Sequence, residues 1–112
     1  MELAERAPSL PASEPVSALV DLSLTVEEHD WLVLVDGSAH PVSLVERAAL
    51  LRGEPFERRV DVAGPALSLR ALARQALGRP RADRSRPLTV CDEAGRYVGL
   101  LRIERLLEAF VA

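Results

Sequence analysis

Two aspartates occupy matching places in two similar stretches of the chain. Asp36 follows the apolar run Trp31 to Val35, and Asp92 follows the apolar run Leu88 to Cys91, 56 positions later. Many enzymes use a pair of carboxylates as general acid and general base. Each Asp, however, opens a short polar segment between two apolar runs, where Asp side chains form local hydrogen bonds in turns. We therefore interpret both as turn residues and not as catalytic groups.

The single cysteine and the two histidines are the next candidates for chemistry. Cys91 could sense oxidants, but the position 56 residues earlier is Val35, which favours a buried small side chain. His40 matches Arg96 by the same offset, which indicates an exposed turn position, and His29 lies in a polar connector. Neither histidine has a partner at metal-ligand spacing, so we predict no metal site.

Arginine supplies all fourteen basic residues, and lysine is absent. A Schiff-base lysine and a phosphate-loop lysine are therefore excluded, and no Gly-x-Ser-x-Gly motif occurs. The sequence thus predicts that the chain is not an enzyme. A group of six arginines could still bind an anion: Arg79, Arg81, Arg84, Arg86, Arg102 and Arg105. For the first four, we favour the interpretation that they lie in a solvated loop.

The elements that position these residues are clearest near the C-terminus. Leu88 to Cys91 is long enough for a strand and too short for a buried helix. Residues 92–95 form a turn in which Gly95 can take a positive φ, and Tyr97 to Leu101 is a second strand. A helical stripe follows, with apolar residues at i, i+3, i+4 and i+7: Ile103, Leu106, Leu107 and Phe110.

The same unit occurs earlier, which predicts an internal tandem repeat. The offset of 56 places Leu32 on Leu88 and Leu44 on Leu100, while an offset of 53 places Leu19 on Leu72 upstream. In the first copy we expect an edge segment at 9–11, a helix from Ser13 as N-cap to about residue 26, strands at 31–35 and 41–45, and a helix at 46–51. In the second we expect a strand at 60–62, a helix capped by Ser68 and ended by Gly78, and the closing unit above.

Length and charge limit the classes of function. A chain of 112 residues forms one compact domain or two half-domains. The net charge of −3 argues against nucleic-acid and anionic-membrane binding. There is neither an apolar run of membrane-spanning length nor a signal-peptide core, so a cytoplasmic location is expected.

The second copy resembles a cystathionine-β-synthase (CBS) domain, a motif that usually occurs in tandem as a Bateman module. The resemblance rests on Val60 to Val62, the helix from Ser68, and the apolar strand, Asp-x-x-Gly turn and apolar-Gly-apolar-apolar pattern between Leu88 and Leu101. It implies an α/β fold (α+β by some conventions) of two β-α-β-β-α repeats about a pseudo-twofold axis, with repeat one at about 8–53 and repeat two at about 54–112.

The resemblance also implies a ligand cleft between the motifs that takes adenosine nucleotides. In the family, a Thr or Ser three residues after the strand glycine contacts phosphate, and an Asp three residues further holds the ribose. Here those positions are Arg102 and Arg105 after Gly99, and Glu46 and Ala49 after Ser43. We therefore expect no binding of AMP, ATP or S-adenosylmethionine through the usual contacts. The candidate cleft residues are Asp61, Val62, Arg96, Arg102 and Arg105.

Two functions remain after these considerations. The leading one is a non-catalytic regulatory or protein-interaction module without a cofactor, acting as a homodimer and serving an effector domain or protein partner. The alternative is a sensor of an adenine nucleotide or another anionic ligand in the inter-repeat cleft. For the dimer, we expect exposed apolar stripes on the two short helices that end the copies: Leu50, Leu51, Leu106, Leu107 and Phe110.

Overall fold

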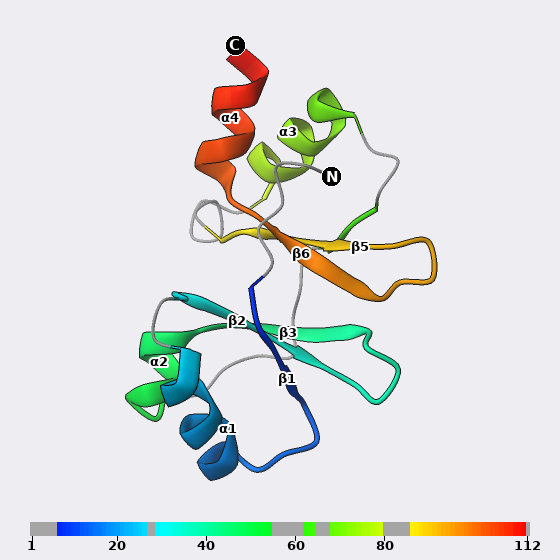
Figure 1. Ribbon diagram of the computed structural model, residues 1–112. Coiled ribbons are helices and arrows are strands. Elements are labelled where there is room, and N and C mark those ends of the chain that lie inside the picture. Colours follow the sequence, from blue (N-terminus) through cyan, green and yellow to red (C-terminus); the bar gives the residue numbers. More distant parts are fainter. Residues whose placement is uncertain (1–6, 27–28, 55–61, 65–67, 80–85, 112) are drawn as a thin grey trace. The chain divides into compact units, whose positions relative to one another are not determined.

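A computed structural model describes residues 7–26, 29–54, 62–64, 68–79 and 86–111 of the chain (Figure 1). The described residues fall into two compact units, one between residues 7 and 60 and one between residues 61 and 112. No helix among the described residues is long and apolar enough to cross a membrane.

The first unit is a three-stranded sheet with helices on one face (Figure 1). Its strands are β1 (Ser9–Pro11), β2 (Trp31–Val35) and β3 (Pro41–Glu46). Between β1 and β2 lie helix α1 (Val16–Ser23) and the 3₁₀ turn η1 (Leu24–Val26), and α2 (Arg47–Leu51) follows β3. β2 pairs in parallel with β1 and antiparallel with β3.

The second unit repeats this order. It contains β4 (Val62–Ala63), α3 (Leu69–Leu77), β5 (Leu88–Cys91), β6 (Tyr97–Leu101) and α4 (Ile103–Val111). β5 pairs in parallel with β4 and antiparallel with β6. α3 begins 69 − 16 = 53 residues after α1, and α4 begins 103 − 47 = 56 residues after α2. The structure therefore confirms the two offsets and the α+β fold of two β-α-β-β-α repeats.

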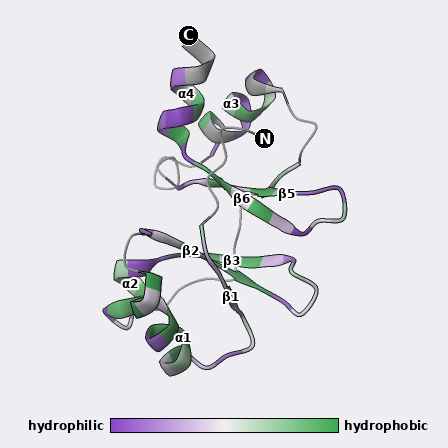
Figure 2. Cartoon of the chain, viewed as in Figure 1, coloured by the Kyte–Doolittle hydropathy of each residue, from purple (hydrophilic) through white to green (hydrophobic). Residues whose placement is uncertain are grey.

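Each unit has its own hydrophobic core between the sheet and its helices. Figure 2 shows that hydrophobic residues occur along the strands and helices of both units. Alternate residues of the central strand face the helices, because side chains of a strand point to opposite faces in turn. In β2 these are Leu32 and Leu34, which cluster with Leu10 and Leu19. In β5 they are Leu88 and Val90, which form part of the following cluster: Ala63, Leu72, Leu88, Val90, Leu101, Ile103 and Leu106.

The central strands are also buried on the face away from the helices. Val33 in β2 and Thr89 in β5 are fully buried, although neither belongs to the helix-facing cores. Strands that are buried on both faces are expected to be apolar almost without alternation, and the sequence of both strands follows that rule. Thr89 departs from it, and its hydroxyl oxygen has no hydrogen-bond partner among the described residues.

A β-bulge interrupts the hairpin of each unit at the same place. Leu34 pairs with Ser43 but Val35 pairs with Pro41, which leaves Val42 extra. Val90 pairs with Gly99 but Cys91 pairs with Tyr97, which leaves Val98 extra. Gly99 thus lies beside a bulge, as an isolated glycine in a strand often does. The residue at the equivalent position of the first hairpin is Ser43, which is fully buried. The bulge alone therefore does not require a glycine.

The hairpin turns also match, with one difference in sequence. Gly95 has φ of 81°, as predicted, and its counterpart in the first turn is Ala39, with φ of 65°. A left-handed conformation costs a residue with a Cβ about 1–2 kcal/mol. The first turn does contain a glycine, Gly37, but it lies two positions before the left-handed residue.

The helix ends confirm some predictions and correct others. Ser68 caps α3, since its Oγ accepts a hydrogen bond from the Ala71 N–H at 3.2 Å. Ser13 does not cap α1, because the N-cap is Pro15, which makes no side-chain cap bond. Gly78 follows α3 without a positive φ, so it is not a left-handed cap.

The expected apolar stripes are only partly exposed. Leu50 and Leu106 are core residues, because each lies almost completely buried beneath its sheet, whereas Leu51 is 37% exposed. The side chains of Leu107 and Phe110 lie outside the described ones. Val16 in α1 and Leu24 in η1 are apolar residues that are about half exposed.

Candidate functional site

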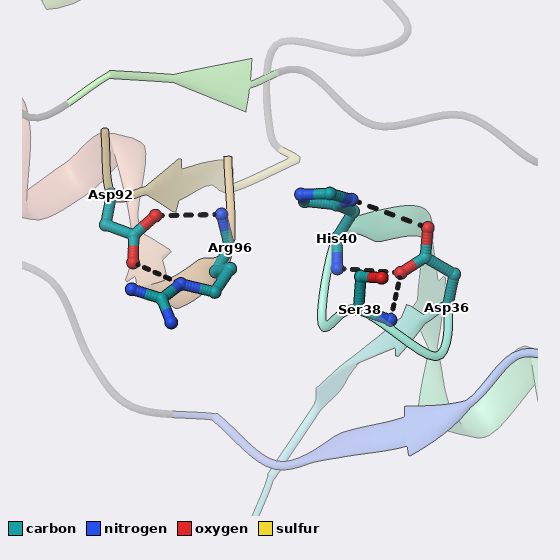
Figure 3. A network of polar contacts seen from close by, with 5 residues as sticks. All are labelled: Asp36, Ser38, His40, Asp92 and Arg96. Atoms are coloured by element: carbon teal, nitrogen blue, oxygen red, sulfur yellow. Dashed lines mark hydrogen bonds and ion pairs between the residues drawn. The ribbon is translucent and has the colours of Figure 1, made fainter. Parts of the chain in front are cut away.

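The two aspartates serve their own hairpin turns (Figure 3). Asp36 Oδ1 accepts hydrogen bonds from the Ser38 and His40 N–H groups at 2.9 and 3.0 Å. Asp92 Oδ1 accepts equivalent bonds from the Ala94 and Arg96 N–H groups, both at 2.9 Å. This confirms the prediction that the carboxylates are turn residues.

The second oxygen of each carboxylate faces a basic side chain four residues along (Figure 3). Asp92 Oδ2 lies 3.0 Å from Arg96 Nε, and Asp36 Oδ2 lies 3.6 Å from His40 Nδ1. The backbone N–H of Arg96 is the main cause that lowers the pKa of Asp92, and the backbone N–H of His40 does the same for Asp36. A carboxyl held in the charged form by local donors is poorly suited to act as a general acid.

Cys91 is buried and has no disulfide partner. Burial raises the pKa of its thiol, and the neighbouring charge of Asp92 adds to the effect. Because the thiolate is the reactive form, a raised pKa makes the thiol inert. The prediction of a structural cysteine is therefore confirmed. The described residues also contain no group of three or more His, Cys, Asp or Glu that could hold a metal ion.

The candidate cleft residues of the second repeat lie at both ends of its sheet. Val62 pairs with Thr89 at the start of β5, and Leu88 pairs with Leu101, the residue before Arg102. Val62 and Arg102 thus lie at one end, and Arg105 is exposed on the first turn of α4. Asp61 lies outside the described residues.

Arg96 is not brought to the same end. It precedes the five-residue strand β6, whereas Arg102 follows it, and a separation of 102 − 96 = 6 positions along a strand spans roughly 20 Å. The Arg96 guanidinium is engaged by Asp92 in the turn. The structure therefore separates Arg96 from Val62 and Arg102.

Arg79 does not have the solvated side chain that the sequence favoured. Arg79 is 7% exposed, and it donates a hydrogen bond from Nη2 to the Arg86 carbonyl oxygen at 2.6 Å. A buried guanidinium that closes a loop in this way has a structural role. Arg81 and Arg84 lie outside the described residues.

Two cavities lie within the first unit, and sequence reasoning missed both. One, of about 260 Å³, lies beside the start of α1 and has this lining: Ala12, Glu14, Pro15, Val16, Leu19, Leu34, Val42 and Ser43. The other, of about 280 Å³, lies where β2 begins and β3 ends, and we call it the Trp31 cavity after its lining: His29, Asp30, Trp31, Glu46, Arg47 and Ala48. The sequence carried no signal for either cavity, because each joins residues that are distant along the chain.

Known structures match this chain over almost its whole length. OpuCA from Staphylococcus aureus has a TM-score of 0.76 at 16% identity, with 98% of this chain and 95% of that chain covered. A CBS domain protein from Shewanella oneidensis has a TM-score of 0.68 at 19% identity, with 99% and 95% covered. A CBS-domain pair with bound AMP from Klebsiella pneumoniae has a TM-score of 0.68 at 16% identity, with 99% and 96% covered.

The chain has the fold of a CBS-domain pair. No family model matches the sequence, and no curated protein matches it either. Some structures with this fold are parts of longer chains. The cytosolic domain of the Mg²⁺ channel MgtE in complex with ATP matches with a TM-score of 0.71 at 16% identity, over 90% of this chain but 44% of that one.

The residues that directly precede α2 and α4 occupy equivalent positions of the two repeats and differ in charge. Arg102 directly precedes α4, and its carbonyl oxygen accepts the Leu106 N–H at 3.1 Å. Glu46 is the residue before α2 in the first repeat. A cationic side chain precedes α4 and an anionic side chain precedes α2, so the two repeats carry opposite charges at equivalent positions.

Proposed function

We propose that the chain is a non-catalytic regulatory or protein-interaction module of the CBS-pair type. The observation that carries the proposal is the likeness to solved CBS pairs over almost the whole chain. The chemistry of the described residues supports it, because both turn carboxylates and the single thiol have structural roles. We further propose that it acts in the cytoplasm on an effector domain or a protein partner.

The proposed module works as a homodimer that packs through the helices of the first unit. Support comes from apolar side chains that the helices expose, because contiguous apolar surface often marks an interface. Arg47 Nε donates to the Ser23 carbonyl oxygen at 2.9 Å, so the start of α2 lies against the end of α1. The exposed apolar residues of this helical region are Val16, Leu22, Leu24 and Leu51.

Light scattering tests this proposal. The unmodified chain should give the mass of a dimer at micromolar concentration, and Leu24→Arg should give a monomer that remains folded. Val98→Arg is the matched control, since Val98 is an apolar residue of comparable exposure, 43% against 51% for Leu24, but lies on a strand. A monomeric unmodified chain, or equal dissociation by both variants, would overturn the dimer.

A second candidate function is the sensing of an adenine nucleotide or another anion. Two observations favour it: a CBS pair with this fold has bound AMP, and Val62 and Arg102 lie at one end of their sheet. The proposed contacts are Asp61, Val62, Arg102 and Arg105, with Arg96 left out because Asp92 holds it at the other end. Arg105 stands where the family has a ribose-holding Asp, so phosphate and not ribose supplies the affinity.

Thermal unfolding with a set of ligands tests the sensor. A ligand at a hundred times its dissociation constant adds about 2.7 kcal/mol, which raises Tm by many degrees in a domain of this size. ATP should raise Tm more than AMP, adenosine should have no effect, and Arg102→Ala should abolish the ATP effect. A shift with adenosine, or an ATP shift that survives Arg102→Ala, would contradict this set of contacts.

A further inference from the structure

The two repeats carry opposite net charges. Residues 7–60 contain nine acidic and four basic residues, a net charge of 4 − 9 = −5, whereas residues 61–112 contain six acidic and nine basic residues, a net charge of 9 − 6 = +3. These two ranges contain the first and the second compact unit. The small net charge of the whole chain therefore conceals a division between its halves, and such a division favours contact between surfaces of opposite charge.

The division of charge extends to the first helix of each unit. α1 carries Asp21 and α3 carries Arg74, and the offset of 74 − 21 = 53 makes them equivalent residues of the two repeats. Both side chains are exposed. Neither has an ion-pair partner within the part of the chain that the structure describes. Each charge is therefore available for a contact with another molecule.

An exposed leucine lies three residues after each of these charges. Leu24 is 51% exposed and Leu77 is 52% exposed, and they too are separated by 53 positions. Residues three apart are neighbours on a helical surface. Both units therefore present an apolar side chain beside a charge, and the sign of the charge is reversed between them.

A twofold dimer can join these surfaces in two ways. If the first unit met the first unit, the two copies of Asp21 would lie in a contact between two acidic units. If the first unit met the second unit of the other copy, Asp21 would meet Arg74. Like charges across an interface are unfavourable, whereas opposite charges favour and direct association. Because every copy carries both surfaces, the chain supplies its own complementary partner.

We propose that the α1 surface of the first unit, formed by Asp21 and Leu24, binds the α3 surface of the second unit of another copy, formed by Arg74 and Leu77. A closed twofold dimer makes this contact twice. The leucines supply apolar area, and the charges select which units meet. This pairing rests on the homodimer proposed above, and it names the surface that the helices of the first unit meet.

The sign of the salt dependence tests the pairing on the unmodified chain. Sedimentation equilibrium measures the dissociation constant of the dimer at low and at high sodium chloride. Salt screens exposed charges, so a contact between opposite charges should weaken, and we expect the dissociation constant to rise about fivefold between roughly 0.05 and 0.5 M. A contact between like units would instead tighten, because salt would screen its repulsion.

The outcomes separate the pairing from the dimer itself. A dissociation constant that is unchanged or lower at high salt would overturn the contact between unlike units and leave the homodimer standing. A monomer at both salt concentrations would overturn the homodimer. A mass that grows beyond two copies would show an open chain of copies and contradict the closed dimer.

Charge-reversal variants assign the effect to the two helices. Asp21→Arg and Arg74→Asp each place like charges at both contacts, so each should weaken the dimer about tenfold. The double variant Asp21→Arg/Arg74→Asp restores opposite charges and should dimerise like the unmodified chain. An equimolar mixture of the two single variants should also dimerise, which distinguishes a contact between copies from a contact within one chain.

Glu14→Arg is the matched control, because it makes the same change of charge at an exposed position of the same unit but lies before α1. It should change the dissociation constant by less than about twofold. Asp21→Asn and Arg74→Gln replace a reversal variant that does not fold, and each should weaken the dimer about threefold. Full dimerisation of both single variants, or weak dimerisation of the double variant or of the mixture, would contradict the pairing of Asp21 with Arg74.

Discussion

Thr89 is a buried hydroxyl where its repeat partner is apolar. Its Oγ1 has no hydrogen-bond partner among the described residues, and the equivalent position, 89 − 56 = 33, is a fully buried valine. A buried polar group without a partner costs about 1–3 kcal/mol. Thr and Val have nearly the same shape. Exchanging them at positions 89 and 33 therefore changes the polarity of the buried side chain while its packing stays nearly the same.

Thr89→Val should therefore raise the free energy of unfolding by about 1 kcal/mol. Val33→Thr should lower it by a similar amount, since it places a hydroxyl at the matching position. Urea denaturation of the two variants and the unmodified chain measures both effects. A loss of stability in Thr89→Val would show that the hydroxyl makes a bond that stabilises the folded chain.

The left-handed residues of the two turns provide a second comparison. Ala39 and Gly95 hold the same place, with φ of 65° and 81°. Ala39→Gly should stabilise the chain by about 0.5–1 kcal/mol, because glycine adopts this conformation without a Cβ clash. Gly95→Ala should destabilise it by about the same amount, and the midpoint of urea unfolding reports both. Two changes of the same sign would contradict the equivalence of the turns.

The turn carboxylates should make stability depend on pH. In the folded chain the pKa of Asp92 is lowered below its ordinary value of 3.8, and that of Asp36 is lowered too. The two aspartates therefore stabilise the folded chain fully at pH values above their pKa in the unfolded chain. This stabilisation is lost as pH falls through their lowered pKa in the folded chain. We expect the urea midpoint to fall as pH decreases below about 4, and to fall less steeply in Asp92→Asn. If the urea midpoint of Asp92→Asn fell with pH as steeply as that of the unmodified chain, other carboxyl groups would be the cause of the loss of stability in acid.

At the scale of the elements, the repeats differ most at the start of their first helices. Ser68 accepts the Ala71 N–H and caps α3, whereas α1 begins after Pro15, and Ser13 lies before this N-cap. Loss of a side-chain cap costs about 0.5–2 kcal/mol. Pro15 has no side-chain acceptor, so the N–H groups in the first turn of α1 receive no side-chain cap.

We accordingly expect Ser68→Ala to lower the free energy of unfolding by about 1 kcal/mol. Ser13→Ala should leave it unchanged within experimental error, although the sequence favours Ser13 as a cap as strongly as Ser68. Equilibrium unfolding by urea measures the difference between the two. A larger loss for Ser13→Ala would show that Ser13 stabilises the helix start in solution.

For the whole molecule, the proposed dimer predicts that stability depends on concentration. Association stabilises the folded chain by mass action, so Tm should rise with protein concentration. Differential scanning calorimetry across a hundredfold range should show the rise in the unmodified chain and its loss in Leu24→Arg. A constant Tm in the unmodified chain would contradict a dimer that dissociates on unfolding.

The sequence alone determined the order of the elements and the repeat. Apolar periodicity depends on local spacing, so the strands at 31–35 and 88–91 and the offsets of 53 and 56 were predicted and are confirmed. The turn roles of Asp36 and Asp92 were predictable for the same reason, because their hydrogen bonds reach no further than four residues.

Only the tertiary structure decided which apolar residues form the core and where cavities lie. Leu50 and Leu51 are neighbours of the same type, yet one is buried and the other exposed, because burial depends on which face of a five-residue helix meets the sheet. Leu24 is likewise an apolar residue that is about half exposed, and it lies where the chain leaves α1 as a 3₁₀ turn. The Trp31 cavity joins Asp30 and Glu46 across a hairpin, a pairing set by register and not by sequence distance.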